Sequence, residues 1–184
     1  YSRDGRSLVF VTWNDEELGS VHVVTDGRER AVTKERGHYA DPCFSPDGQW
    51  VVFGKQSGGY LTSPIWSAKP GLYRVPAAGG DLQFISKKGT NAQFGAEADR
   101  VFVLTVESQR DADRRCLVSM KLDGTDERVH YTSENATEYR VSPDGKWLAT
   151  GKQRDAANWE IGRMNVDTGE YRTVVTQGFR IGHV

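Results

Sequence analysis

The stretch FSPDGQWVVF, residues 44–53, decides the fold. It begins on an apolar residue, passes through a Ser-Pro-Asp-Gly turn and runs into a short apolar segment. Proline fixes φ at the second turn position, aspartate accepts hydrogen bonds from its own backbone, and glycine takes the positive φ that completes the turn. The stretch therefore predicts two β-strands joined by a tight turn.

The same pattern recurs along the whole chain. It returns as VSPDGKWLA at residues 141–149, as YSRDGRSLVF at residues 1–10, and in degenerate form as FGAEADRVFV at residues 94–103. The apolar anchors that open the copies are 43, 50 and 47 residues apart, at Tyr1, Phe44, Phe94 and Val141. A repeat of about 40–50 residues built from short strands is typical of β-propeller blades.

Each copy continues with two further β-rich runs and a second polar turn. These turns are of the Asp-Gly or Gly-Gly type that joins hairpin strands, and they lie near Asp26, Gly80, Gly124 and Gly169. The chain is therefore predicted to be all-β, without helices: a β-propeller of four four-stranded antiparallel blades. The blades cover residues 1–33, 39–86, 91–131 and 136–175. The first blade lacks most of its inner strand, and residues 179–184 resemble the inner strand of a next blade.

Two arrangements of these blades remain open. In one, residues 180–184 pair with residues 8–11 and close a four-bladed ring. In the other, the blades form an arc of a larger six- to eight-bladed ring, and flanking blades complete it. The repeat resembles those of wider rings, whose wedge angle is too small to close at four, so we expect the arc.

The repeat positions also predict the core. Side chains that recur at equivalent places are expected to be buried between blades, namely Phe44, Val52, Phe94, Phe102, Val141 and Leu148. Cys43 falls in an inner strand and Cys116 opens the third strand of another blade, so no disulfide is expected between them.

Composition excludes several classes of protein. The net charge is −1, and basic residues are mixed with acidic ones, so no basic stripe for nucleic acid is present. Asp111 and Asp113 interrupt the basic run of Arg110, Arg114 and Arg115, which is expected in a solvated loop. No apolar run approaches the roughly 18 residues of a membrane span. The chain opens inside a repeat, so the absence of a signal peptide says nothing about export.

These repeats resemble the TolB-like, WD-type blades of bacterial propellers. Residues 71–80, GLYRVPAAGG, are similar to propellers attached to amidohydrolases, and residues 177–184, QGFRIGHV, to oligogalacturonate lyase-like proteins. The resemblance implies a periplasmic or otherwise exported bacterial protein. It also implies, in the lyase-like group, a divalent metal held by several histidines and a glutamine. Only His183 matches that set, so no metal ligand and no cofactor is assigned.

Binding residues are expected on one face of the propeller. The four strands of a blade are called A to D, from the innermost strand outward. The A–B and C–D turns are short and regular, whereas the B–C and D–A loops on the other face are long and varied, and such loops usually carry function. The candidate binding residues are Tyr60 and Trp66 in the longest loop, and His38, Asp41, Arg140, Arg180 and His183 beside the central channel. The two aromatic residues stack on a sugar or peptide, or pack their loop onto its own blade. The channel residues do acid–base work, or form a polar lining.

Two function hypotheses follow. The first is a binding or scaffolding segment of a larger protein, which presents its B–C and D–A face to an oligosaccharide, a peptide, a protein partner or an attached domain. The second is part of a metal-dependent, oligogalacturonate lyase-like catalytic propeller that uses Arg180 and His183. The four histidines are scattered along the chain and no nucleophile or Walker motif is present, which favours the first hypothesis and assigns no catalytic residue.

Overall fold

The computed structural model describes residues 1–56, 69–108, 113–133, 138–153 and 158–177. It contains four antiparallel meanders of β-strands, and the described residues form no helix. The first sheet has three strands, β1 (Ser7–Thr12), β2 (Ser20–Thr25) and β3 (Arg28–Ala31). The second has four: β4 (His38–Phe44), β5 (Trp50–Gln56), β6 (Gly71–Pro76) and β7 (Gln83–Ser86).

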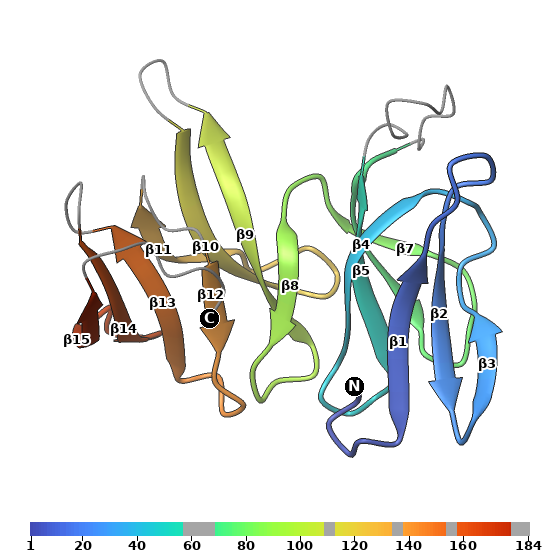
Figure 1. Cartoon of the computed structure of the whole chain (residues 1–184), viewed down its shortest axis with the longest axis horizontal. Coiled ribbons are helices and arrows are strands. Elements are labelled where there is room, and N and C mark those ends of the chain that lie inside the picture. The colour runs from blue at the N-terminus through green and yellow to red at the C-terminus, as the bar shows by residue number, and fades with distance from the viewer. Residues whose placement is uncertain (57–68, 109–112, 134–137, 154–157, 178–184) are drawn as a thin grey trace.

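The third and fourth sheets repeat this four-stranded order. The third consists of β8 (Thr90–Phe94), β9 (Arg100–Ser108), β10 (Asp113–Lys121) and β11 (Arg128–Ser133), and the fourth of β12 (Glu138–Val141), β13 (Trp147–Gln153), β14 (Trp159–Asn165) and β15 (Tyr171–Gln177). Figure 1 shows the four sheets side by side as blades. The inner strands β4, β8 and β12 contact each other in turn, and β1, the first strand of the three-stranded sheet, contacts β4. The predicted all-β propeller architecture is confirmed.

The Ser-Pro-Asp-Gly turns have the expected hydrogen bonds. The Ser45 hydroxyl donates to Asp47 Oδ1 at 2.5 Å, and the same carboxylate oxygen accepts the Gln49 backbone N–H at 3.1 Å. Gly48 has φ +70°, a conformation that L side chains rarely adopt. These contacts show that the turn aspartates satisfy local backbone and hydroxyl donors.

Apolar side chains from facing sheets fill the space between neighbouring blades. One cluster joins the first and second blades, another the second and third, and a smaller one the third and fourth. Four of the six predicted core residues are buried: Phe44, Val52, Phe102 and Leu148. Phe94 and Val141 are only half-buried, and both line a cavity of about 340 Å³ at the A–B turns. For these two residues the prediction of full burial is wrong.

The strands extend further into the expected loops than the sequence suggested. The loop expected around Arg114 and Arg115 is shorter than the sequence suggested, because β9 continues to Ser108 and β10 begins at Asp113. Arg115 therefore pairs with Val106 in a β-ladder instead of lying in a solvated loop. The apolar pattern of the sequence indicates which strand residues are buried. It does not indicate where these strands end, because the polar residues at their ends pair with each other without being buried.

Both cysteines are free, as expected. Cys116 is buried and Cys43 packs against the same core cluster between the second and third blades. Burial raises the pKa of the Cys43 thiol to about 12, with a smaller contribution from the nearby charge of Asp41. The alternative in which residues 180–184 pair with residues 8–11 and close a four-bladed ring is not tested, because residues 180–184 lie outside the described part of the chain.

Candidate functional site

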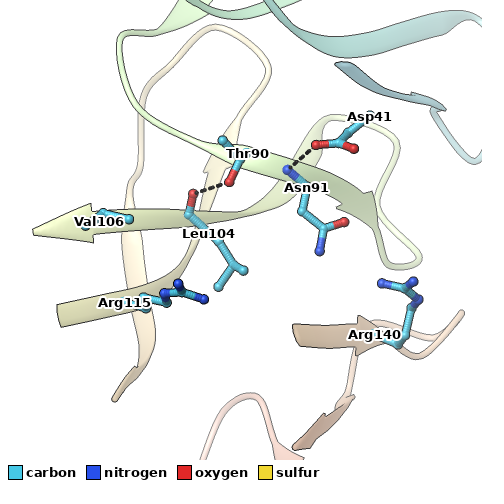
Figure 2. A pocket seen from close by; sticks show the side chains of 7 residues that line it. All are labelled: Asp41, Thr90, Asn91, Leu104, Val106, Arg115 and Arg140. Atoms are coloured by element: carbon cyan, nitrogen blue, oxygen red, sulfur yellow. Dashed lines mark hydrogen bonds between the residues drawn. The ribbon is translucent and has the colours of Figure 1, made fainter. Parts of the chain in front are cut away.

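Three inner strands converge on an open pocket at the B–C and D–A face. The pocket has a volume of about 440 Å³, within the range of small-molecule sites. Strands of the second, third and fourth blades supply its lining, which Figure 2 shows as Asp41, Thr90, Asn91, Leu104, Val106, Arg115 and Arg140. Because three blades contribute, the site exists only when the blades are packed together.

Two β-bulges place polar residues in this pocket. In β4, Asp41 and Pro42 stand opposite a single residue of β5, and in β8, Asn91 and Ala92 stand opposite a single residue of β9. A bulge bends its strand and redirects a side chain, and bulges are common next to binding and active sites. The fourth blade differs, since β12 pairs with β13 in an unbroken register.

Both bulges carry a left-handed backbone. Asp41 has φ +50° and Asn91 has φ +52°, and aspartate and asparagine are the side chains that best tolerate this region. The Asp41 carboxylate accepts the backbone N–H of Asn91 at 3.2 Å. This contact links the inner strands of the second and third blades at the wall of the pocket (Figure 2).

Hydrogen bonds also lock the third blade to the fourth beside the pocket. The Gln93 side chain donates to the backbone oxygen of Tyr139 at 2.9 Å and accepts the Val141 N–H at 3.0 Å. The Tyr139 hydroxyl donates to the backbone oxygen of Asn91 at 2.6 Å. Burial raises the pKa of Tyr139 well above its usual range, so this hydroxyl remains a donor. Arg140 follows directly and is held by a 3.0 Å bond from its guanidinium to the Tyr139 carbonyl.

The pocket presents opposite charges to the same space. Arg140 and Arg115 supply guanidinium groups from two walls, and Asp41 supplies a carboxylate. Figure 2 shows the Arg140 guanidinium pointing toward Asn91, with Leu104 between the two arginines. Such a lining can bind a polar ligand by charge-assisted hydrogen bonds and also offers it a small apolar surface.

The structure brings together two of the predicted binding residues, Asp41 and Arg140. His38 lies in β4 but outside the pocket lining, with its ring 4.8 Å from the Trp13 ring. Tyr60, Trp66, Arg180 and His183 lie outside the described residues, so their predicted roles stay predictions. Within the described ranges no three His, Cys, Asp or Glu side chains gather as metal ligands, and no helix there is long and apolar enough to span a membrane.

Sequence reasoning missed the rest of the lining. Asn91 could have been found, because it precedes the anchor Phe94 by three residues as Asp41 precedes Phe44. Arg115 and Val106 gave no such signal, since their place depends on how far β9 and β10 extend beyond the core.

Comparison with known proteins defines the class of fold. No family model matches the chain, and no curated protein matches it in sequence. Solved β-propellers do match in structure. TolB from Acinetobacter baumannii gives a TM-score of 0.71 at 14% identity, over 94% of this chain and 41% of that one. The fold is therefore that of TolB-like propellers.

Other structures with this fold include enzymes. Oligogalacturonate lyase from Vibrio parahaemolyticus gives a TM-score of 0.67 at 11% identity, over 94% of this chain and 51% of that one. A puromycin-hydrolyzing peptidase from Mycobacterium tuberculosis gives 0.68 at 15% identity, over 96% of this chain and 32% of that one. The chain thus spans about half or less of each of these three proteins, and at these identities the likeness concerns the fold alone.

Proposed function

We propose that the chain is a binding segment of a larger, exported bacterial propeller, and that its ligand occupies the pocket at the B–C and D–A face. The observation that carries the proposal is the pair of bulged inner strands, which aim Asp41 and Asn91 into one pocket with Arg140. Left-handed non-glycine residues cost free energy, and such strain concentrates at functional sites.

The outer face of the fourth blade supports a larger ring. Ala149 and Ile161 occupy the repeat positions of Val52 and Leu72, which are buried between the second and third blades. Both are only half-buried here, and Val175, paired with Ile161, is 39% exposed. We expect this face to bind anilinonaphthalene sulfonate, and Ile161→Lys to reduce the fluorescence. Unchanged fluorescence in this variant would contradict the assignment of the face to a further blade.

Binding is tested by amide NMR titration of the 184-residue chain. The probes are oligogalacturonate, a neutral oligosaccharide, short peptides and single amino acids. At least one probe is expected to give saturable shifts at Asn91 and Arg140, and none at Gly48 in the opposite A–B turns. Arg140→Gln should abolish the shifts, whereas Arg163→Gln, which changes an arginine outside this pocket, should leave them. Saturable shifts confined to the A–B turns, or no shifts at all, would refute the proposal.

The structural likeness to oligogalacturonate lyase suggests a second function, that of a metal-dependent lyase, which can be tested separately. In that function Arg180 and His183 act with a divalent metal, and the chain cleaves oligogalacturonate to an unsaturated product. We expect no unsaturated product when oligogalacturonate and Mn²⁺ are added to the chain. Product that forms with Mn²⁺ and is abolished by His183→Ala would replace the binding function with the catalytic one.

A further inference from the structure

The pocket carries hydrogen-bond donors on one wall and an acceptor beside them. One terminal nitrogen of Arg140 is bonded to the Tyr139 carbonyl, which fixes the base of the guanidinium and leaves further N–H groups for a ligand. The Asn91 side-chain oxygen accepts a hydrogen bond from the Gln93 amide at 3.2 Å. This bond fixes the orientation of the Asn91 amide, whose N–H groups point away from Gln93. The Arg140 guanidinium and the Asn91 amide line the same pocket and are both donors, and a carboxylate accepts hydrogen bonds from such groups.

The Asp41 carboxylate lies on the other side of Asn91 (Figure 2). One of its oxygens accepts the Asn91 backbone N–H, which holds the carboxylate in place. A ligand with only positive charge would be repelled by Arg140 and Arg115. A ligand with only negative charge would pair with these arginines but would leave Asp41 facing a like charge. The charges are therefore matched by a ligand that bears both signs close together.

An apolar surface completes the pocket. Leu104 and Val106 line it from β9, and Val106 is 54% exposed, so its apolar surface is accessible to a ligand. A ligand with an aliphatic group would cover this surface.

We propose, on the basis of the binding function above, that the ligand is a free α-amino acid with an aliphatic side chain. Its carboxylate binds Arg140 and the Asn91 amide, its ammonium group binds Asp41, and its side chain covers Leu104 and Val106. Because the charged residues are solvent-exposed, the affinity is modest, with a dissociation constant of about 1 mM.

The test compares L-leucine with its two halves, by NMR titration of the 184-residue chain. Isocaproate has the carboxylate without the ammonium group, and isoamylamine has the ammonium group without the carboxylate. Each half is expected to bind at least about tenfold more weakly than L-leucine, because each lacks one charge-assisted contact.

Two variants assign the contacts. Arg140→Gln should weaken L-leucine about tenfold, since a guanidinium–carboxylate contact is lost. Asp41→Asn keeps a residue that tolerates the left-handed backbone and should weaken L-leucine about threefold, while isocaproate binds no worse than before. Arg163→Gln is the matched control and should change neither ligand.

The outcomes separate the ligand class from the site. Equal weakening of L-leucine and isocaproate by Asp41→Asn would overturn the zwitterion proposal. So would the absence of L-leucine binding, whereas saturable shifts at Asn91 and Arg140 with another probe would leave the binding function standing.

Discussion

The second and fourth blades share a strand sequence but differ in how deeply it is buried. β5 reads WVVFGKQ and β13 reads WLATGKQ. In each blade an arginine of the next strand lies over the tryptophan ring. The distance from the arginine Cζ to the ring centroid is 4.4 Å for Arg74 and Trp50, and 4.7 Å for Arg163 and Trp147. Val52 is nevertheless fully buried, whereas Ala149 at the same position is half-buried. Local sequence thus sets pairing and stacking, while the neighbouring blade sets the burial of each side chain.

The largest difference is expected at the fourth position of these strands. Phe53 has no exposed surface and packs edge-on against Tyr39, with ring centroids 5.3 Å apart. Phe53→Ala should lower the free energy of unfolding by about 3–5 kcal/mol, and Thr150→Ala in the fourth blade by about 1 kcal/mol. Urea unfolding with an unchanged slope measures both. Because Thr150 is also buried, the difference reports the size of the buried side chain, and equal losses would show that Phe53 contributes no more packing than Thr150.

The tryptophans sharpen the comparison. Both lose an arginine stack when truncated, but only Trp50 also packs against the core cluster of a following blade. Trp50→Ala should cost about 3 kcal/mol and Trp147→Ala about 1 kcal/mol. If Trp147→Ala proves the more costly in thermal and urea unfolding, the contrast between covered and uncovered blade faces fails.

The smallest effect concerns the residue that precedes each anchor, Cys43 in the second blade and Arg140 in the fourth. The Cys43 thiol has a pKa of about 12 in the folded chain, against about 8.5 when unfolded. Its contribution to stability is therefore complete below about pH 8.5 and declines as the pH rises toward 12. Between about pH 8 and pH 10 the urea midpoint should fall more for the wild type than for Cys43→Ala.

The control for this prediction is Arg140→Ala, which should keep the pH dependence of the wild type. Burial also raises the pKa of Tyr39 to about 12, but this tyrosine is present in all three proteins, so the difference isolates the thiol. An identical decline in wild type and Cys43→Ala would show that the thiol stays exposed to water.

Most of the fold could be predicted from the sequence, because turn residues and apolar runs act locally. The Asp47 turn and the run from Val51 to Phe53 determine a hairpin by themselves. The incomplete burial of Phe94 could not be predicted, because it depends on how inner strands of different blades meet.

The candidate site was predicted in part. Asp41 and Arg140 were found because the residues before each anchor must lie near the channel. Arg115 was missed because it was expected in a loop, and His38 was grouped with the channel residues although its ring contacts Trp13. The position of each residue in the repeat predicted its strand correctly. Which side chains meet in the pocket depends on the bulges in β4 and β8 and on how far the pairing of β9 with β10 extends.

The bulges in β4 and β8 have a consequence for how such a pocket can be gained or lost. Each adds one residue opposite a single partner, so the ladder resumes on both sides with every other side chain still on its original face. Two of the polar side chains of the pocket, those of Asp41 and Asn91, thus lie where a strand has one extra residue. Deletion of Asp41 or Asn91 would give a regular inner strand like β12. A blade could therefore gain or lose a ligand contact through one residue, while its core packing stays the same.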